Sequence, residues 1–299
     1  MTYQIGIDSG GTHIVGTAWD DSGKQLAQTT AGPGNILLDG PGTMRNLHRV
    51  IEKLTAELDG QACTQILAGI AGSATTGNGD SVAAQLQKDF SIPTAVINDA
   101  ELALLNGLEG ADGTLVIAGT GSITYGRQSG QFLRVGGWGQ LLGDTGSAYQ
   151  IFALAMKKAL AAHDRGEASP LITLCQSLLE ADSMPAAVRR FYQLDRAHLA
   201  AFAAKIAAAA DGGDEAAQAV ITESAEALAQ EVLALLDRYA QPTPLKLALS
   251  GSVLVHNESF RGTLIEAIRR RYPIEAQVVT TNNSRGVLFW HRWQEPKES

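Results

Sequence analysis

Two stretches of the sequence each end an apolar run in glycine and hydroxyl residues, a combination that suits phosphate binding. The run at 5–8 is followed by Ser9, Gly10, Gly11 and Thr12, and the run at 115–119 by Thr120, Gly121 and Ser122. Because glycine has no Cβ, the backbone at these turns can adopt positive φ and approach a ligand closely. Consecutive N–H groups in such a turn form a concave anion site, to which a hydroxyl adds a donor. Taken alone, each stretch is also compatible with a β-hairpin turn.

Three carboxylates stand beside predicted strand or helix ends. Asp8 closes the first apolar run, where it can hold a cation, directly or through water, beside bound phosphates. Asp99 follows the predicted strand at 94–98, and ligands of α/β sheets bind at the carboxyl ends of strands, so Asp99 can take the proton of an attacking hydroxyl group. The same position also suits a helix N-cap. Asp144 precedes a predicted helix and is equally compatible with a cap and a ligand.

The elements that would position these residues occur twice. In the first half the pattern predicts strands at about 4–8, 13–19, 25–31, 64–71 and 94–98, with helices from 41, over 78–90 and from 99. In the second half it predicts strands at about 114–118, 121–127, 131–135, 245–250 and 276–280, with later helices over 257–271 and from 284. Both halves read βββαβαβα, which indicates a duplicated α/β domain rather than a solenoid of short repeats.

The duplication sets the predicted domain boundaries. We expect an N-terminal domain at 1–108, rejoined by the C-terminal helix at 284–299, and a C-terminal domain at 109–283 with an alanine-rich helical insertion at about 148–240. Two similar phosphate turns from two such domains would form an interdomain cleft able to grip a nucleotide.

Composition narrows the function classes. Hydrophobic residues make up 45% and charged residues 18% of the 299 residues, as in ordinary globular proteins. The net charge of −8 gives no electrostatic footprint for nucleic acid or an anionic membrane. The two cysteines, Cys63 and Cys175, form no CxxC pair, which argues for a reducing compartment and against a structural zinc or iron–sulfur site. With neither a signal peptide nor a membrane-spanning apolar run, we expect a cytoplasmic protein.

Longer motifs point to a family. The two turns, with Gly251 and Ser252 downstream, resemble the sugar kinase/Hsp70/actin superfamily, which implies duplicated ribonuclease H-like domains. Within it, the sequences at 98–100 (NDA), 136–139 (GGWG) and 142–148 (LGDTGSA) resemble the N-acetylglucosamine kinases of the BadF/BadG/BcrA/BcrD ATPase family. The resemblance covers most of the chain and is weakest between about 160 and 240.

The resemblance implies ATP-dependent phosphorylation of the 6-hydroxyl group of an amino sugar, N-acetylglucosamine or glucosamine, by a homodimer. Asp99 matches the catalytic base, and Asp8 would hold Mg²⁺. The implied nucleotide ligands are Ser9, Gly10, Gly11, Thr12, Thr120, Gly121, Ser122, Gly251 and Ser252. The implied sugar ligands are Asn35, Ser73, Thr120, Gly137, Trp138, Asp144 and Ala148. Asn35 and Ser73 are equally typical of turns, where small polar residues often only pack.

Two other functions remain as alternatives. One is the activator ATPase of 2-hydroxyacyl-CoA dehydratases, which carries a cysteine-ligated cluster at its dimer interface; two distant cysteines do not suit such a site. The other is a non-catalytic sensor of sugars or nucleotides, in which Asp99 would be expendable.

Overall fold

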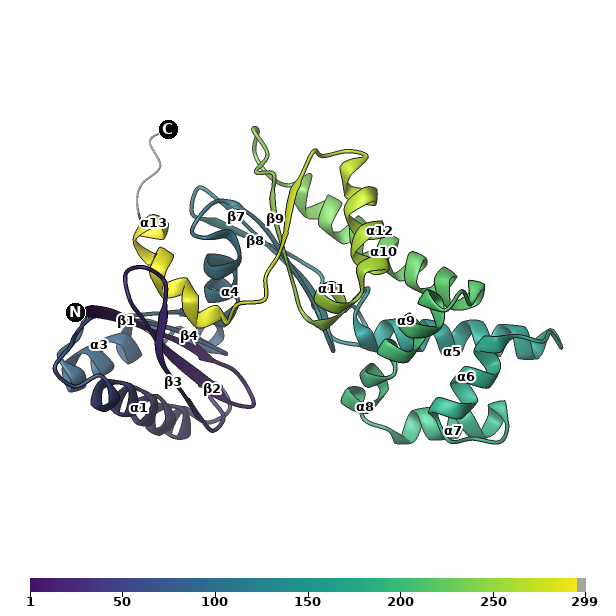
Figure 1. Cartoon of the computed structure of the whole chain (residues 1–299), viewed down its shortest axis with the longest axis horizontal. Helices are drawn as coiled ribbons and strands as arrows, with labels where there is room; N and C mark the ends of the chain where they lie inside the picture. Colours follow the sequence, from purple (N-terminus) through teal and green to yellow (C-terminus); the bar gives the residue numbers. More distant parts are fainter. Residues whose placement is uncertain (295–299) are drawn as a thin grey trace. The chain divides into compact units, whose positions relative to one another are not determined.

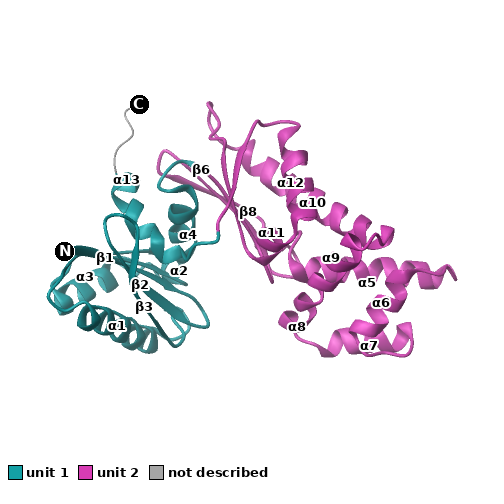
Figure 2. Cartoon of the chain, in the orientation of Figure 1, with its two compact units in different colours: residues 1–112, 280–299 teal, residues 113–279 magenta. Residues whose placement is uncertain are grey.

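The computed structural model describes residues 1–294, which form two compact units (Figure 2). The first unit consists of Met1–Asp112 together with the segment that begins at Thr280, and the second of Gly113–Val279. The sequence places these crossings after residue 108 and at residue 284. Each unit is built around one sheet.

The sheet of the first unit has the strand order β3-β2-β1-β4-β5. The pairs β1–β2 and β2–β3 are antiparallel, whereas β1–β4 and β4–β5 are parallel. Its strands are β1 (Thr2–Ser9), β2 (Ile14–Trp19), β3 (Gln25–Ala31), β4 (Ala62–Ile70) and β5 (Thr94–Asn98). The phosphate turn at 9–12 therefore lies at the carboxyl end of the central strand.

The sheet of the second unit repeats this topology as β8-β7-β6-β9-β10. Its first three strands are again antiparallel neighbours, and β6–β9 and β9–β10 are parallel. The strands are β6 (Gly113–Ala118), β7 (Ser122–Gln128), β8 (Gln131–Val135), β9 (Lys246–Ser250) and β10 (Glu275–Val278). The predicted fold class, an α/β protein of duplicated ribonuclease H-like domains, is confirmed.

Helices cover both faces of the first sheet. On one face, the apolar stripe of α1 packs over the strands with α3, and on the other the C-terminal segment packs with α4. A Cβ on Gly6 of β1 would collide with the carbonyl oxygen of Ser284, so the returning chain lies directly on the central strand. The elements are α1 (Gly40–Glu57), α2 (Ser73–Thr76), α3 (Gly79–Phe90), α4 (Asp99–Leu108), the 3₁₀ helix η1 (Asn283–Phe289) and α13 (Trp290–Gln294).

The second unit has one large core beneath its helices, in which α10 and α12 lie side by side (Figure 1). The helices are α5 (Ala148–Asp164), α6 (Pro170–Leu178), α7 (Met184–Gln193), α8 (Arg196–Ala201), α9 (Ala203–Asp211), α10 (Glu215–Leu236), α11 (Ser252–His256) and α12 (Glu258–Arg269). Phe202 separates α8 from α9 within the helical insertion. Across residues 1–294, no helix is long and apolar enough to cross a membrane.

Candidate functional site

The first phosphate turn is held by hydrogen bonds to Gly34, while other residues of the turn are exposed. The Ser9 side chain is fully buried, and its hydroxyl donates to the Gly34 carbonyl at 2.7 Å, so this hydroxyl serves the fold. The Gly10 carbonyl accepts from the Gly34 N–H at 2.9 Å. Gly11 and Thr12 are exposed. The loop that begins at Gly34 thus fixes the base of the turn.

Glycine is not required here by backbone conformation or by packing. Neither Gly10 nor Gly11 adopts the left-handed region, which corrects the expectation of positive φ. A Cβ on Gly11 would have no neighbour within 4 Å, and one on Gly10 would meet only the His13 carbonyl at 3.5 Å. The free space around both Cα atoms suits the close approach of a ligand.

Two partly buried carboxylates lie at strand ends of the same sheet. Asp8 is near the end of β1, and Asn283 of η1 donates to its Oδ2 at 3.1 Å. Burial raises the pKa of Asp8; the hydrogen bond from Asn283 lowers it, the charge of Asp99 raises it, and His13 lowers it. Burial also raises the pKa of Asp99, against a hydrogen bond from the Ala100 N–H.

Asp99 does not cap α4. The N-cap is Asn98, whose side chain accepts from the Ala100 N–H at 2.8 Å, while Glu101 accepts from the Asn98 N–H at 3.0 Å. This complete capping box leaves the Asp99 carboxylate as the first side chain of the helix, with one hydrogen bond of its own, from Ala100 at 3.0 Å. The structural role that competed with catalysis therefore belongs to its neighbour.

Asp8 fits the requirements of a magnesium ion that is bound together with a nucleotide. Mg²⁺ usually takes one or two carboxylates, substrate phosphates and several waters rather than an all-protein cage. Residues 1–294 contain no group of three or more His, Cys, Asp and Glu that could hold a metal. Asp8 would be the protein ligand, steadied by Asn283.

Asn35 and Ser73 both make local hydrogen bonds near the same strand ends. The Asn35 Oδ1 accepts from the N–H groups of Leu37 and Leu38 at 3.0 and 3.3 Å, which leaves its amide nitrogen as a donor. The buried Ser73 hydroxyl donates to the Ile70 carbonyl at 2.8 Å, at the end of β4. Its proton is thus used by the fold, and the packing role is the one that this contact supports.

The second phosphate turn is anchored in the same way as the first. The Ser122 hydroxyl is buried and donates to the Thr145 carbonyl at 2.7 Å, as Ser9 donates to Gly34. The Gly119 carbonyl accepts from the N–H of Ala148 at 2.8 Å, at the start of α5. Thr120 between them is exposed. Each turn therefore rests on a loop that follows the third strand of its sheet.

The second turn is also packed against a charged pair. Arg196, the first residue of α8, forms an ion pair with the Asp144 carboxylate, which is only 4% exposed. A Cβ on Gly121 would collide with the Arg196 guanidinium and lie 2.9 Å from Asp144 Oδ2. Asp144 does not cap α5, since Ser147 accepts from the Gln150 N–H in that role.

The glycine-rich loop at 136–139 carries the exposed Trp138. Its ring is stacked by the Arg134 guanidinium at 4.4 Å from the centroid, and Gly137 adopts a φ of 69° against the Ile123 side chain. Next to Gly136 lies Glu231 of α10, whose Oε2 is buried without a hydrogen-bond partner. Burial raises the pKa of Glu231, a hydrogen bond from Thr145 lowers it, and the charge of Asp144 raises it.

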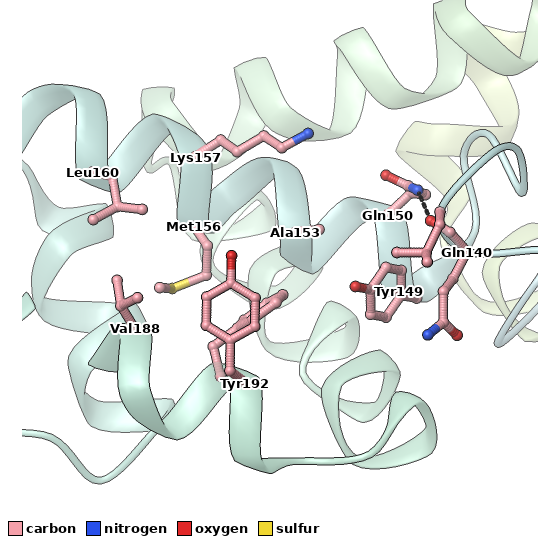
Figure 3. Close-up of a pocket in the computed structure, with 11 residues that line it drawn as sticks. Gln140, Tyr149, Gln150, Ala153, Met156, Lys157, Leu160, Val188 and Tyr192 are labelled. Atoms are coloured by element: carbon pink, nitrogen blue, oxygen red, sulfur yellow. Dashed lines mark hydrogen bonds between the residues drawn. The ribbon is translucent and has the colours of Figure 1, made fainter. Parts of the chain in front are cut away.

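Two cavities adjoin this part of the second unit. One, of about 320 Å³, is lined by the alanines of α8 and α9 and extends to Ser252, next to Gly251 at the end of β9. The other, of about 310 Å³, lies between α5 and α7 next to the loop, where Gln150 donates to the Gln140 carbonyl at 2.7 Å (Figure 3). Its lining includes Lys157 and no carboxylate.

Three site residues escaped the sequence analysis. Asn283 reaches Asp8 across 275 positions, and Arg196 reaches Asp144 across 52. Glu231 lies within a long amphipathic helix, among residues of ordinary helix composition. Partners so distant leave no local spacing pattern; the one weak signal was a basic residue opening an otherwise alanine-rich stretch.

Comparison with known proteins agrees with this geometry. The model of the BadF/BadG/BcrA/BcrD ATPase family matches residues 5–284. An N-acetylmuramic acid/N-acetylglucosamine kinase of Clostridium acetobutylicum is 30% identical over 297 residues, which cover 95% of both chains. An N-acetyl-D-glucosamine kinase of Dictyostelium discoideum is 33% identical over 190 residues, which cover 59% of both chains.

Solved structures share the fold. A candidate N-acetylglucosamine kinase of Chromobacterium violaceum superimposes with a TM-score of 0.68 at 22% identity, over 98% of this chain and 99% of that one. A ROK family glucokinase of Streptomyces griseus, solved with glucose and AMPPNP, superimposes with a TM-score of 0.56 at 15% identity, over 96% of this chain and 97% of that one.

Proposed function

This chain belongs to the BadF/BadG/BcrA/BcrD ATPase family and is an ATP-dependent sugar kinase, and we propose that it phosphorylates the 6-hydroxyl group of an amino sugar, N-acetylglucosamine or glucosamine. The observation that carries the proposal is Asp99, a carboxylate at a strand end that caps no helix and whose charge acts on Asp8.

Asp99 acts as the general base. The sugar oxygen attacks the γ-phosphorus of ATP, the bond from that phosphorus to the bridging oxygen breaks, and its electron pair stays on ADP. Asp99 orients the hydroxyl group and takes its proton. Burial raises the pKa of Asp99, and a base is more effective as its pKa approaches the working pH. The rest of the rate comes from in-line positioning and electrostatics.

The phosphates are bound by the backbone of both turns, at 9–12 and 119–122. A magnesium ion held by Asp8 would neutralise charge on the β- and γ-oxygens. The adenosine lies in the alanine-lined cavity next to Gly251 and Ser252, because the small apolar side chains there leave a space of about 320 Å³.

The sugar is held by Asn35 through its amide nitrogen, by the exposed face of Trp138 and by Asp144, with Gly137, Thr120 and Ala148 as further contacts. Ser73, whose hydroxyl donates to Ile70, is left as a packing residue. A carboxylate and an amide offer an acceptor and a donor for adjacent hydroxyl groups, and an exposed aromatic ring offers an apolar wall. We also propose that the protein acts as a homodimer, as the resemblance implies.

The activator ATPase is disfavoured by where the cysteines lie. Cys175 is fully buried within α6, and burial raises the pKa of its thiol to about 12, whereas a cluster ligand must be an accessible thiolate. Cys63 lies partly buried in β4 of the other unit.

The test is ADP release with a panel of N-acetylglucosamine, glucosamine, N-acetylmuramic acid and glucose. We expect ATP consumption to rise with an amino sugar. Consumption that ignores every sugar, or iron that copurifies with the protein, would contradict the proposal; a protein that binds sugar and nucleotide without turnover would be a sensor.

A further inference from the structure

The guanidinium of Arg196 lies at the phosphate turn itself, although its residue is far away in the sequence. It touches Gly121 so closely that any side chain there would displace it, and it pairs with Asp144 behind the turn. Both contacts are made within the second unit. The glycine of this turn thus makes room for an arginine as well as for a ligand.

Asp144 does not satisfy this arginine. A guanidinium has five N–H donors, and the ion pair uses one nitrogen, Nη2. The Nε atom is buried and has no hydrogen-bond partner in residues 1–294. Burying a donor without an acceptor is destabilising, and arginine is the side chain whose fork matches phosphate oxygens in a bidentate way.

A second carboxylate lies close to this ion pair. Asp144 is almost fully buried, and Glu231 adds a second, partly buried carboxylate close by. Within residues 1–294, Arg196 is the cation that pairs with Asp144. A sugar hydroxyl group that donates to Asp144 would replace part of this pairing and free donors of the guanidinium for an incoming anion.

We propose that Arg196 is a phosphate ligand of the nucleotide, which contacts β- and γ-phosphate oxygens at the turn 119–122 while Asp144 holds it in place. The proposal rests on the ATP-dependent transfer described above. As the bond between the γ-phosphorus and the bridging oxygen breaks, the electron pair and its charge pass to the β-phosphate of ADP, and a guanidinium there stabilises that charge.

The first experiment measures nucleotide binding without sugar, by calorimetry, for wild type and Arg196→Gln. ADP should bind ~10–10²-fold more weakly to the variant, while adenosine, which has no phosphates, should bind as it does to wild type. Arg190→Gln is the matched control, because Arg190 is exposed on α7 and lies outside the site. It should bind both ligands normally.

The second experiment separates Arg196 from Asp144. In Asp144→Asn the amide oxygen still accepts a hydrogen bond from the Arg196 guanidinium and holds it in place, but it no longer competes for the positive charge, so ADP binding should be kept or tightened while sugar binding weakens. Arg196→Lys keeps the charge but loses the fork, and ADP affinity should fall between those of wild type and Arg196→Gln. This conservative variant also serves if Arg196→Gln fails to fold.

Equal ADP affinities of wild type, Arg196→Gln and Arg196→Lys would overturn the proposal, as would an equal loss of ADP and adenosine. In either case Arg196 would only position Asp144. Because ADP binding needs no turnover, this outcome is independent of whether an amino sugar is the acceptor.

Discussion

The two phosphate turns have the same anchor but different surroundings. In both, a buried serine donates to a carbonyl of the loop after the third strand, Ser9 to Gly34 and Ser122 to Thr145. The first turn then opens to free space at Gly11, whereas the second is filled at Gly121 by an arginine–carboxylate pair. Duplication has kept the scaffold of the turn, and the two copies differ in what is placed on it.

The neighbouring carboxylates differ in the same sense. Asp8 and Asp99 of the first unit have no ion pair in the described chain and carry raised pKa values, while Asp144 of the second unit is paired and buried. Unpaired carboxylates suit metal binding and proton transfer, and a paired one suits positioning. We therefore expect the first unit to supply the base and the metal ligand, and the second to supply Asp144 for the sugar and Arg196 for the phosphates.

The largest expected effect is that of Asp99→Asn, which should lower kcat by ~10²–10⁴-fold and leave both ligand affinities near those of wild type. An amide keeps the size of the side chain but cannot accept the hydroxyl proton. Asp59→Asn, at an exposed position in the same unit, is the control. Steady-state kinetics and calorimetry check the result.

A folded Asp99→Asn protein with normal kcat would remove Asp99 from the chemistry. Loss of stability is not expected from this variant, because Asn98 is the cap of α4.

Valine substitutions of Gly11 and Gly121 should show how the two turns differ. The side chain of Gly11→Val would enter free space, so this variant should keep the melting temperature of wild type. It should weaken only the binding of ATP, by about 1–3 kcal/mol of binding free energy. Gly121→Val collides with Arg196 and Asp144, so it should weaken ATP and sugar together and lower the stability of the second unit. Calorimetry and thermal melts compare the two. Equal effects on sugar binding would contradict the difference between the turns.

Alanine substitutions of Ser9 and Ser122 should instead show what the two turns have in common. Ser9→Ala and Ser122→Ala each remove a buried hydroxyl donor and leave a carbonyl without its partner, which costs about 1–3 kcal/mol of unfolding free energy. Denaturant unfolding should give similar losses for both. A large loss for one and none for the other would mean that the anchors are not equivalent.

The smallest expected effect is a pH-dependent change in stability. Burial raises the pKa of Asp99, so its ionised form costs stability in the folded protein. That cost is present above the folded pKa and disappears below the ordinary value of 3.8, where both states are protonated. Asp99→Asn should therefore melt a few degrees above wild type at neutral pH, and the gap should close on acidification. A gap that widens in acid would contradict the burial of the charge.

The sequence predicted the features that follow from repeated local patterns. It did not predict contacts between residues that lie far apart in the chain. The glycine turns and the alternation of strands and helices predicted the strands of both sheets, because each strand is a local pattern, whereas the order of the strands within each sheet was implied only by the family resemblance. Asp99 was found because it ends a strand. The same pattern could not show that Asn98 rather than Asp99 caps the helix, since one residue of register decides it. Nor could it show Arg196 beside Gly121, because that contact depends on how α8 returns to the sheet.

The most direct test of the central claim is the position of phosphate in the product. Wild-type protein with ATP and N-acetylglucosamine or glucosamine should yield a sugar whose phosphorus couples to the protons on C6 in phosphorus–proton NMR, and Asp99→Asn should yield almost none in the same time. Phosphate on the anomeric oxygen, or inorganic phosphate as the only product with every sugar, would contradict the account.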